Sequence, residues 1–188
     1  MIPADENFDG TWPFMPHFST AAGFEQHYVD EGPRDGEALV LLHGEPTWGY
    51  LYRNMIPGLA KKYRVIVPDH MGFGKSATPQ DREYTLRSHV ENLESLVDEL
   101  NLTDITFVGQ DWGGPITGAF TARNPEKVQR LFLMNTVLGY GGGQASGGKT
   151  PWFQWIAKHA NNGTLEGILG EMGSTVLSVM KIIGFQNS

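Results

Sequence analysis

The stretch VGQDWGG, from Val108 to Gly114, decides the fold of this chain. It follows a short apolar run, and its three glycines surround a single acid, Asp111. Glycine on both sides of one polar residue allows a sharp turn from a strand into a helix, which holds that side chain exposed. The helix that follows turns its positive end toward Asp111 and favours the carboxylate. We interpret Asp111 as a nucleophile; a helix N-cap is the alternative, but capping does not require flanking glycines.

Apolar runs on both sides of this turn predict a sheet. Four runs are continuously apolar, as in strands that are covered on both faces: Ala38 to Leu42, Val65 to Pro68, Ile105 to Val108 and Leu131 to Met134. Helical patterns occupy Tyr84 to Leu100 and Asp111 to Arg123. This alternation predicts a doubly wound, mostly parallel α/β sheet. Phe24 to Asp30 is expected to be an antiparallel edge strand.

The pattern changes after Asn135, where a glycine-rich stretch leads into helical patterns only. Thr150-Pro151 is typical of a helix start, and apolar spacing predicts further helices around residues 165–172 and 176–183. We therefore expect residues 1–136 to form the N-terminal part of an α/β core. Residues 137–188 are expected to begin a helical cap that lies over the carboxyl edge of the sheet.

Composition excludes several classes of function. The net charge is −7, with 14 Lys and Arg against 21 Asp and Glu, which argues against nucleic acid or an anionic membrane as partner. The chain has no cysteine, so disulfides and thiol chemistry are excluded and zinc is disfavoured. No apolar run approaches the roughly 20 residues of a membrane span, and the acidic N-terminus lacks a signal-peptide pattern. The expected location is the cytoplasm.

Two glycine motifs are similar to nucleotide-binding motifs, but each lacks a required part of the pattern. GFGKS, Gly72 to Ser76, resembles the end of a phosphate-binding P-loop, but Asp69 stands where the first glycine would be. Gly72 and Gly74 half-match a dinucleotide fingerprint, but Thr78-Pro79 follows instead of a helix. We expect neither a nucleotide nor any other cofactor.

Three motifs resemble, in order and spacing, the haloalkane dehalogenase family of the α/β-hydrolase superfamily: HGEPTW (His43 to Trp48), DHMGFGKS (Asp69 to Ser76) and GQDWGG (Gly109 to Gly114). With Glu45 at its third position, the HGEPTW motif is most similar to that of the subgroup whose second halide donor is a cap tryptophan. The resemblance runs from about Phe24 to Asn135. It implies an α/β-hydrolase fold and cleavage of carbon–halogen bonds, with a small halogenated aliphatic substrate, water and halide as partners.

The resemblance also implies roles for residues. Asp111 would attack the halogen-bearing carbon and form an alkyl ester. The backbone N–H groups of Glu45 and Trp112 would form an oxyanion hole for ester hydrolysis. The indole N–H of Trp112 would bind the leaving halide, with core packing as the alternative. The carboxylate of Glu45 would position the hydrolytic water, with a surface acid as the alternative. Trp48 is expected to pack beneath the loop.

The cap is expected to supply a second halide donor, for which Trp155 matches the family spacing better than Trp152; packing is the alternative for both. The family takes its histidine base and the acid of this subgroup from segments after the cap. None of the six histidines follows it, and His43 lies where the family uses a structural histidine. We therefore expect this chain to be part of a longer enzyme, to be completed by a second chain, or to be a natural truncation.

Incompleteness would leave the sheet with an unpaired edge, which favours association. Two other functions stay open. Epoxide hydrolases share the Asp-Trp-Gly turn, but they usually carry an aromatic residue in place of Glu45 and use cap tyrosines, of which the expected cap has only Tyr140. The non-enzyme alternative is a binding module on a truncated hydrolase scaffold.

Overall fold

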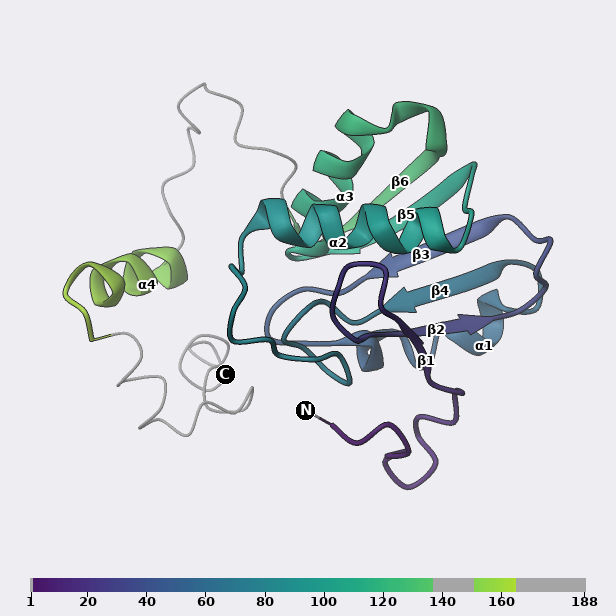
Figure 1. Cartoon of the computed structure of the whole chain (residues 1–188), viewed down its shortest axis with the longest axis horizontal. Helices are drawn as coiled ribbons and strands as arrows, with labels where there is room; N and C mark the ends of the chain where they lie inside the picture. Colours follow the sequence, from purple (N-terminus) through teal and green to yellow (C-terminus); the bar gives the residue numbers. More distant parts are fainter. Residues whose placement is uncertain (1, 137–150, 165–188) are drawn as a thin grey trace, which may run out of the picture. The chain divides into compact units, whose positions relative to one another are not determined.

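The computed structural model describes residues 2–136 and 151–164 (Figure 1). The chain divides into two compact units, Met1–Gly139 and Tyr140–Ser188. The first contains, in chain order, β1 (His17–Ser19), β2 (Gln26–Glu31), β3 (Ala38–Leu42), a 3₁₀ turn (Gly49–Tyr52), α1 (Ile56–Leu59), β4 (Arg64–Pro68), α2 (Leu86–Glu99), β5 (Ile105–Gln110), α3 (Gly113–Arg123), a second 3₁₀ turn (Pro125–Lys127) and β6 (Val128–Met134). The second contains α4 (Pro151–Asn161).

The six strands form one mixed sheet with the order β1-β2-β4-β3-β5-β6. Strands β3 to β6 run parallel, which confirms the predicted α/β architecture and all four predicted parallel strands. The antiparallel direction of β2 is also confirmed, but its predicted place at the edge is wrong. The edge belongs to β1, which pairs Phe18 with His27 and has only three residues. A strand this short has no recognisable periodicity.

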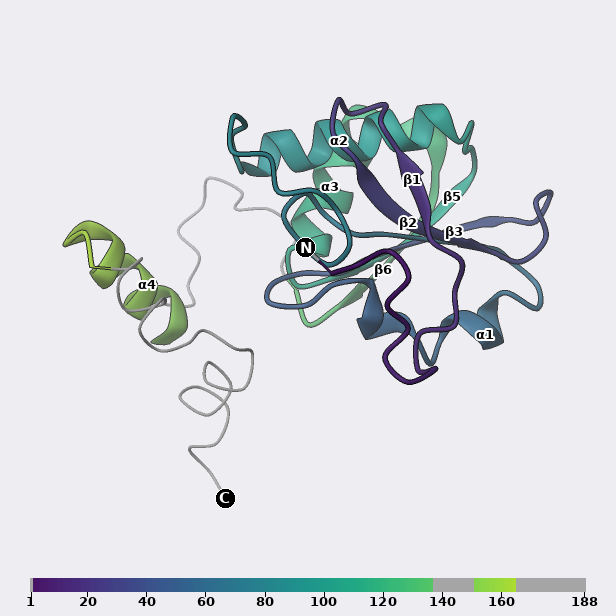
Figure 2. The same cartoon turned by 60° about the horizontal axis from the view of Figure 1, so that its bottom comes forward.

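Both faces of the sheet are buried over β2 to β5, which explains why β3, β4 and β5 read as continuous apolar runs, whereas β6 is partly exposed. Helices α2 and α3 cover one face, and α1 and the N-terminal segment cover the other (Figures 1 and 2). Val40, Ile66 and Phe107 face the two long helices, with Leu93 of α2 and Phe120 of α3 among their contacts. The opposite core packs the other side chains of the same strands against the N-terminal segment and α1: Trp12, Leu39, Leu41, Val65, Val67 and Ile56.

Both long helices begin two residues later than their sequence patterns suggest. At α2, the Thr85 hydroxyl accepts the Ser88 backbone N–H, and the Ser88 hydroxyl accepts the Thr85 N–H. This reciprocal cap fixes Leu86 as the first helical residue. At α3, the helix begins at Gly113 because the chain turns sharply at Asp111.

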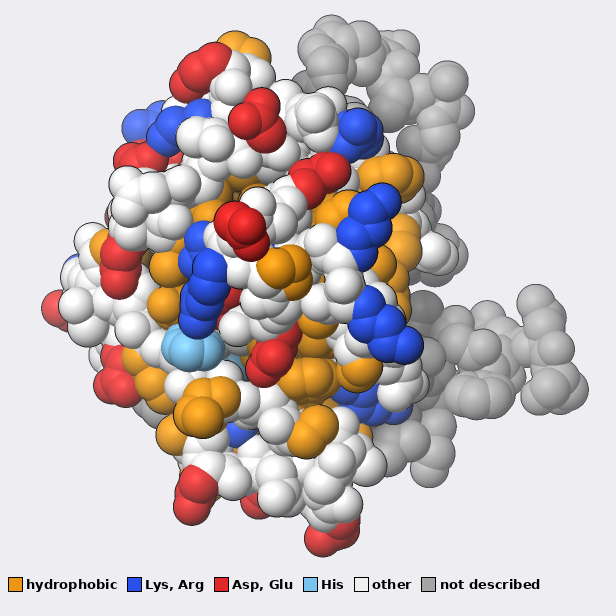
Figure 3. Space-filling view, turned by 90° about the vertical axis from the view of Figure 1, so that its right-hand side faces the viewer, with side chains coloured by type: hydrophobic (Ala, Val, Ile, Leu, Met, Phe, Trp, Pro, Cys, Tyr) orange, Lys and Arg blue, Asp and Glu red, His pale blue; other side chains and the backbone are white. Residues whose placement is uncertain are grey.

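The end of the sheet where the parallel strands begin carries charges of both signs (Figure 3). Arg64 donates to Asp30 at 2.8 Å and Arg130 donates to Glu37 at 2.7 Å. Basic side chains are therefore interspersed with acids here. Asp30 is buried, whereas the Arg130–Glu37 pair lies at the surface, where an ion pair contributes little to stability.

Within residues 2–136, β6 pairs with β5 only, so it is the unpaired edge that the sequence predicts. Phe132 is 57% exposed and Leu133 is 39% exposed on this strand. The predicted helix start at Pro151 is confirmed by α4. The helices expected around residues 165–183 lie outside the described residues, and the cap arrangement stays a prediction. None of the helices in the described ranges combines the length and apolarity of a membrane span.

Candidate active site

Asp111 lies at the sharp turn between β5 and α3. Its φ is +50°, a left-handed conformation that strains a residue with a side chain. The flanking glycines make the turn possible. A Cβ on Gly109 would lie 2.8 Å from the Gly113 carbonyl oxygen, and a Cβ on Gly113 would lie 2.2 Å from that of Leu42. The strained turn expected from the sequence is therefore observed, and Asp111 is not the N-cap of α3, which is Trp112.

The loop after β3 reaches this turn. The backbone N–H of Glu45 donates to Oδ1 of Asp111 at 2.9 Å. Gly44 makes the approach possible, because a Cβ there would lie 2.3 Å from Oδ1 of Asp111 and 2.6 Å from the backbone nitrogen of Trp112. The structure thus brings together three of the predicted site residues: Asp111, Glu45 and Trp112. Their chemical roles stay predictions.

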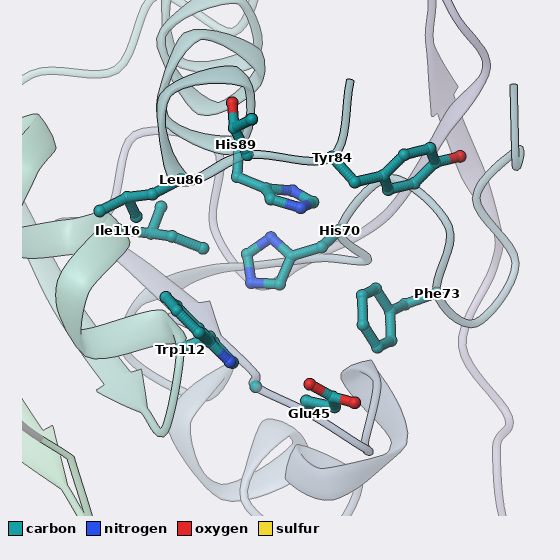
Figure 4. A pocket seen from close by; sticks show the side chains of 10 residues that line it. Glu45, His70, Phe73, Tyr84, Leu86, His89, Trp112 and Ile116 are labelled. Carbon is teal, nitrogen blue, oxygen red and sulfur yellow. The ribbon is translucent and has the colours of Figure 1, made fainter. Parts of the chain in front are cut away.

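A pocket of about 290 Å³ opens beside the turn (Figure 4). Its lining residues are Gly44, Glu45, His70, Phe73, Tyr84, Thr85, Leu86, His89, Trp112 and Ile116. Asp111 is not one of them, but Gly44 and Glu45, which approach its carboxylate, and Trp112, which follows it in the chain, are. Trp112 is 44% exposed, so it is a pocket wall and not a core residue.

The wall of the pocket is largely apolar, and some of its polar groups are already bonded. The Tyr84 hydroxyl donates to the Pro79 carbonyl at 2.9 Å, and Thr85 caps α2. The indole of Trp112 contributes an N–H donor and Glu45 contributes a carboxylate. His70 and His89 add two imidazole rings whose centroids lie 5.5 Å apart.

Burial sets the protonation of these groups. Desolvation lowers the pKa of His70 well below its ordinary value, helped by His43 and His89. Desolvation also lowers the pKa of His43 and of His89. The three rings are therefore neutral near pH 7. For Glu45, partial desolvation and then the charge of Asp111 raise the pKa of the carboxyl group.

The structure accounts for two of the aromatic and histidine interpretations. Trp48 packs against Phe8, Trp12 and Tyr50, as predicted for a residue beneath the loop. His43 is fully buried, and its ring nitrogens bond the Gly44 carbonyl and the His70 backbone N–H. Its contacts are structural.

The two predicted cap tryptophans lie in the second unit. The Trp155 ring packs on His159 within α4, with centroids 4.7 Å apart, and the Trp152 side chain lies outside the described residues. Their roles as halide donors stay predictions.

The lysine of the P-loop-like sequence is already bonded within the fold. The Lys75 side chain is 2% exposed and donates to the carbonyls of Ala4 and Glu6 at 2.8 and 2.7 Å. Its backbone N–H donates to Oδ2 of Asp69. These bonds leave Lys75 unable to bind a phosphate. Across the described ranges, no group of three or more acidic or histidine side chains is arranged to hold a metal ion.

Sequence reasoning did not identify His70, Phe73, His89 and Ile116 as pocket residues. His70 alone left a signal, because a histidine directly after a buried strand lies at the carboxyl edge of a parallel sheet, where ligands bind. The other three reach the pocket through packing of α2, α3 and the loop after β4.

A parallel sheet with a strained acid at the turn after β5, and a backbone donor from the loop after β3, defines an α/β hydrolase. The comparisons with known proteins agree: the chain belongs to the alpha/beta hydrolase fold family, which matches residues 37–159.

Individual relatives within this family are similar to the chain over most of its length. A haloalkane dehalogenase of Psychrobacter cryohalolentis is 44% identical over 153 residues, which are 80% of this chain and 50% of the relative. A cis-3-alkyl-4-alkyloxetan-2-one decarboxylase of Shewanella oneidensis is 43% identical over 131 residues, 68% of this chain and 41% of the relative. The solved haloalkane dehalogenase DpaA of Paraglaciecola agarilytica, described as tetrameric, is 35% identical with a TM-score of 0.70, over 80% of this chain and 52% of that one. The chain thus spans about half the length of these relatives.

Proposed function

We propose that this chain carries the nucleophilic part of a hydrolase that cleaves carbon–halogen bonds of small haloalkanes. The observation that supports the proposal most is the conformation of Asp111. Its backbone has a positive φ, its Oδ1 accepts the Glu45 N–H, and an apolar pocket lies beside it. Haloalkane dehalogenases at 44% and 45% identity support the same assignment.

The hydrogen bond from Glu45 distinguishes the two oxygens of Asp111. Oδ1 is held by the donor, so Oδ2 is the oxygen that attacks carbon. The carbon–halogen bond breaks as the carbon–oxygen bond forms, and the halide leaves with the bonding electron pair. Trp112 lines the same pocket, and its indole N–H would stabilise the departing halide. Trp155, or Trp152 in its place, would supply a second N–H.

Oδ1 then becomes the carbonyl oxygen of the alkyl ester. When water attacks the carbonyl carbon of this ester, negative charge develops on Oδ1, to which the Glu45 N–H already donates. The backbone N–H of Trp112 would complete the oxyanion hole. In its ionised form the Glu45 carboxylate would accept a hydrogen bond from the attacking water. Collapse of the intermediate releases the alcohol and restores Asp111.

The water must lose a proton to a base. His43 and His70 are buried and bonded to the loop backbone, and His27 donates to or accepts from Asp69 at 2.9 Å. His89 lines the pocket but lies in α2, whereas the resemblance to the family places the base after the cap, so we assign the histidine base and its acid partner to segments outside this chain. The 188-residue chain alone is then expected to form the ester without hydrolysing it.

Bromide release from 1,2-dibromoethane tests this proposal. We expect about one bromide per chain, released as the ester forms, and none from Asp111→Asn. Release that survives Asp111→Asn would contradict the proposal, and no release at all would favour a non-catalytic binding module. Continued turnover by the chain alone would refute the assignment of the base to another segment.

Epoxide hydrolysis is the second candidate, because a solved structure described among novel epoxide hydrolases is 30% identical with a TM-score of 0.63. The described pocket contains one tyrosine, Tyr84, and its hydroxyl is bonded to Pro79. Ring opening needs a donor to the epoxide oxygen, so this contact disfavours the candidate. Styrene oxide tests the epoxide candidate, and a cis-dialkyl oxetanone tests the activity named in other relatives. Each serves as a competing substrate in the bromide-release assay.

A further inference from the structure

The motif DHMGFGKS has no role in the chemistry proposed above, yet its first two residues hold the loop that carries Glu45. Asp69 and His70 directly follow β4. The loop from His43 to Gly49 follows β3, the parallel neighbour of β4. The carboxyl ends of both strands meet at one edge of the sheet, which brings the two segments together.

His70 contacts the beginning of this loop through two hydrogen bonds. Its backbone N–H donates to Nε2 of His43 at 3.0 Å. Nε2 of His43 is therefore unprotonated, and Nδ1 carries the proton that is donated to the Gly44 carbonyl at 3.0 Å. Nε2 of His70 lies 2.8 Å from the His43 carbonyl oxygen, which can only accept. His70 thus carries its proton on Nε2, and both tautomers are fixed by their partners.

Asp69 holds the other end of the loop. Its Oδ1 accepts the Gly49 N–H at 2.8 Å, and its Oδ2 accepts the Lys75 N–H at 2.9 Å. The loop is thereby fixed at both ends by two consecutive residues. Asp69 also binds His27, so it supports the whole turn, whereas within the described residues the His70 side chain bonds only to the His43 carbonyl.

The loop has little freedom between these points. Gly44 lies so close to Asp111 that even a Cβ would be 2.3 Å from Oδ1. The His43 carbonyl and the Glu45 N–H belong to consecutive peptide units, which meet at Cα of Gly44, and the Glu45 N–H donates to the same Oδ1 at 2.9 Å. A shift of the His43 carbonyl would therefore move the donor relative to the carboxylate.

We propose that His70 is a positioning residue, whose side chain holds the His43 carbonyl so that the Glu45 N–H stays on Oδ1 of Asp111. The catalytic consequence rests on the function proposed for Asp111. The hydrogen-bond arrangement itself does not.

Three variants test the proposal, with two measurements on the full chain. His70→Leu removes the donor, and His70→Gln replaces it with an amide N–H of similar reach. His89→Leu is the matched control, because His89 lines the same pocket next to His70 but makes no side-chain hydrogen bond to the described loop from His43 to Gly49. The measurements are hydrogen exchange of the Glu45 amide by NMR and the rate of Asp111 alkylation by 1,2-dibromoethane.

We expect His70→Leu to speed exchange of the Glu45 amide by about tenfold, since the unpaired His43 carbonyl destabilises the held loop. Alkylation is expected to slow by about tenfold, because a carboxylate without its fixed donor presents Oδ2 to the pocket less often. His70→Gln should bring both rates to within about threefold of the original chain. His89→Leu should leave the exchange rate of the Glu45 amide unchanged.

Unchanged Glu45 exchange in folded His70→Leu would overturn the proposal, and so would a His70→Gln variant that behaves like His70→Leu. If His70→Leu does not fold, His70→Asn replaces it, since its shorter amide cannot reach the His43 carbonyl and the same exchange result is expected. If no variant is alkylated but the exchange pattern holds, the proposed function fails and the positioning role stands.

Discussion

Gly44 brings the loop after β3 close to the turn at Asp111. We predict that Gly44→Ala slows alkylation of Asp111 by about a hundredfold, because the added methyl group would displace the carboxylate or the loop. Single-turnover bromide release measures this rate.

Gly58→Ala is the matched control. Gly58 lies in α1, and a Cβ there would meet nothing within 4 Å. It should leave alkylation unchanged and raise the free energy of unfolding by about 0.5–1 kcal/mol, since alanine favours a helix. A Gly44→Ala chain that is alkylated at the original rate would show that the close approach has no functional consequence.

Asp111 could be predicted from sequence because its signal is local: glycines on both sides of one acid permit a turn that few other sequences allow. The role of His70 could not be predicted in the same way. Its partners are the ring and carbonyl of His43, 27 residues away, and they meet only when β3 pairs with β4.

At the scale of elements, the reciprocal cap of α2 sets both the start of the helix and the position of Leu86 at the pocket. We predict that Thr85→Ala lowers the free energy of unfolding by about 1 kcal/mol, because the Ser88 backbone N–H loses its acceptor. Urea unfolding measures the change.

Ser95→Ala is the comparison for this prediction, since among the residues that the structure describes the Ser95 hydroxyl bonds only to the Glu91 carbonyl of the same helix. Its effect should be within about 0.5 kcal/mol. Equal losses for the two variants would mean that the cap adds nothing beyond a surface hydroxyl.

The central strands were predictable because burial on both faces leaves a continuous apolar run, as in β3. The ends of the elements were not. The start of α2 depends on a serine that serves as a cap, and the start of α3 depends on the strain at Asp111. The edge strand β1 takes its conformation from pairing with β2 and not from its own sequence.

At the scale of the whole molecule, buried neutral histidines make folding sensitive to acid. Burial lowers the pKa of His43, His70 and His89 from their ordinary value of 6.5. Below about pH 6.5 the unfolded chain binds protons that the folded chain does not, so the free energy of unfolding falls as the pH falls. The free energy of unfolding is therefore not reduced by these histidines above about pH 6.5, and it is reduced progressively below that pH.

His43 and His70, which are both buried, together contribute a slope that approaches about 2.7 kcal/mol per pH unit, and His89 adds to it. Glu45, whose pKa is raised, acts in the opposite direction, chiefly at lower pH. Urea unfolding between about pH 7.5 and 5.5 measures the slope. His70→Gln removes one of the three groups and should lower the slope by about 1.4 kcal/mol per pH unit; a slope that is the same in both chains would contradict the assignment.

The location of the covalent adduct tests the nucleophile most directly. The chain is incubated with 1,2-dibromoethane and digested, and its peptides are sequenced by tandem mass spectrometry. We predict a single alkyl ester on Asp111, and an unmodified peptide from the Asp111→Asn chain. An adduct on Glu45 or on a histidine, with Asp111 unmodified, would contradict the assignment of Asp111 as the nucleophile.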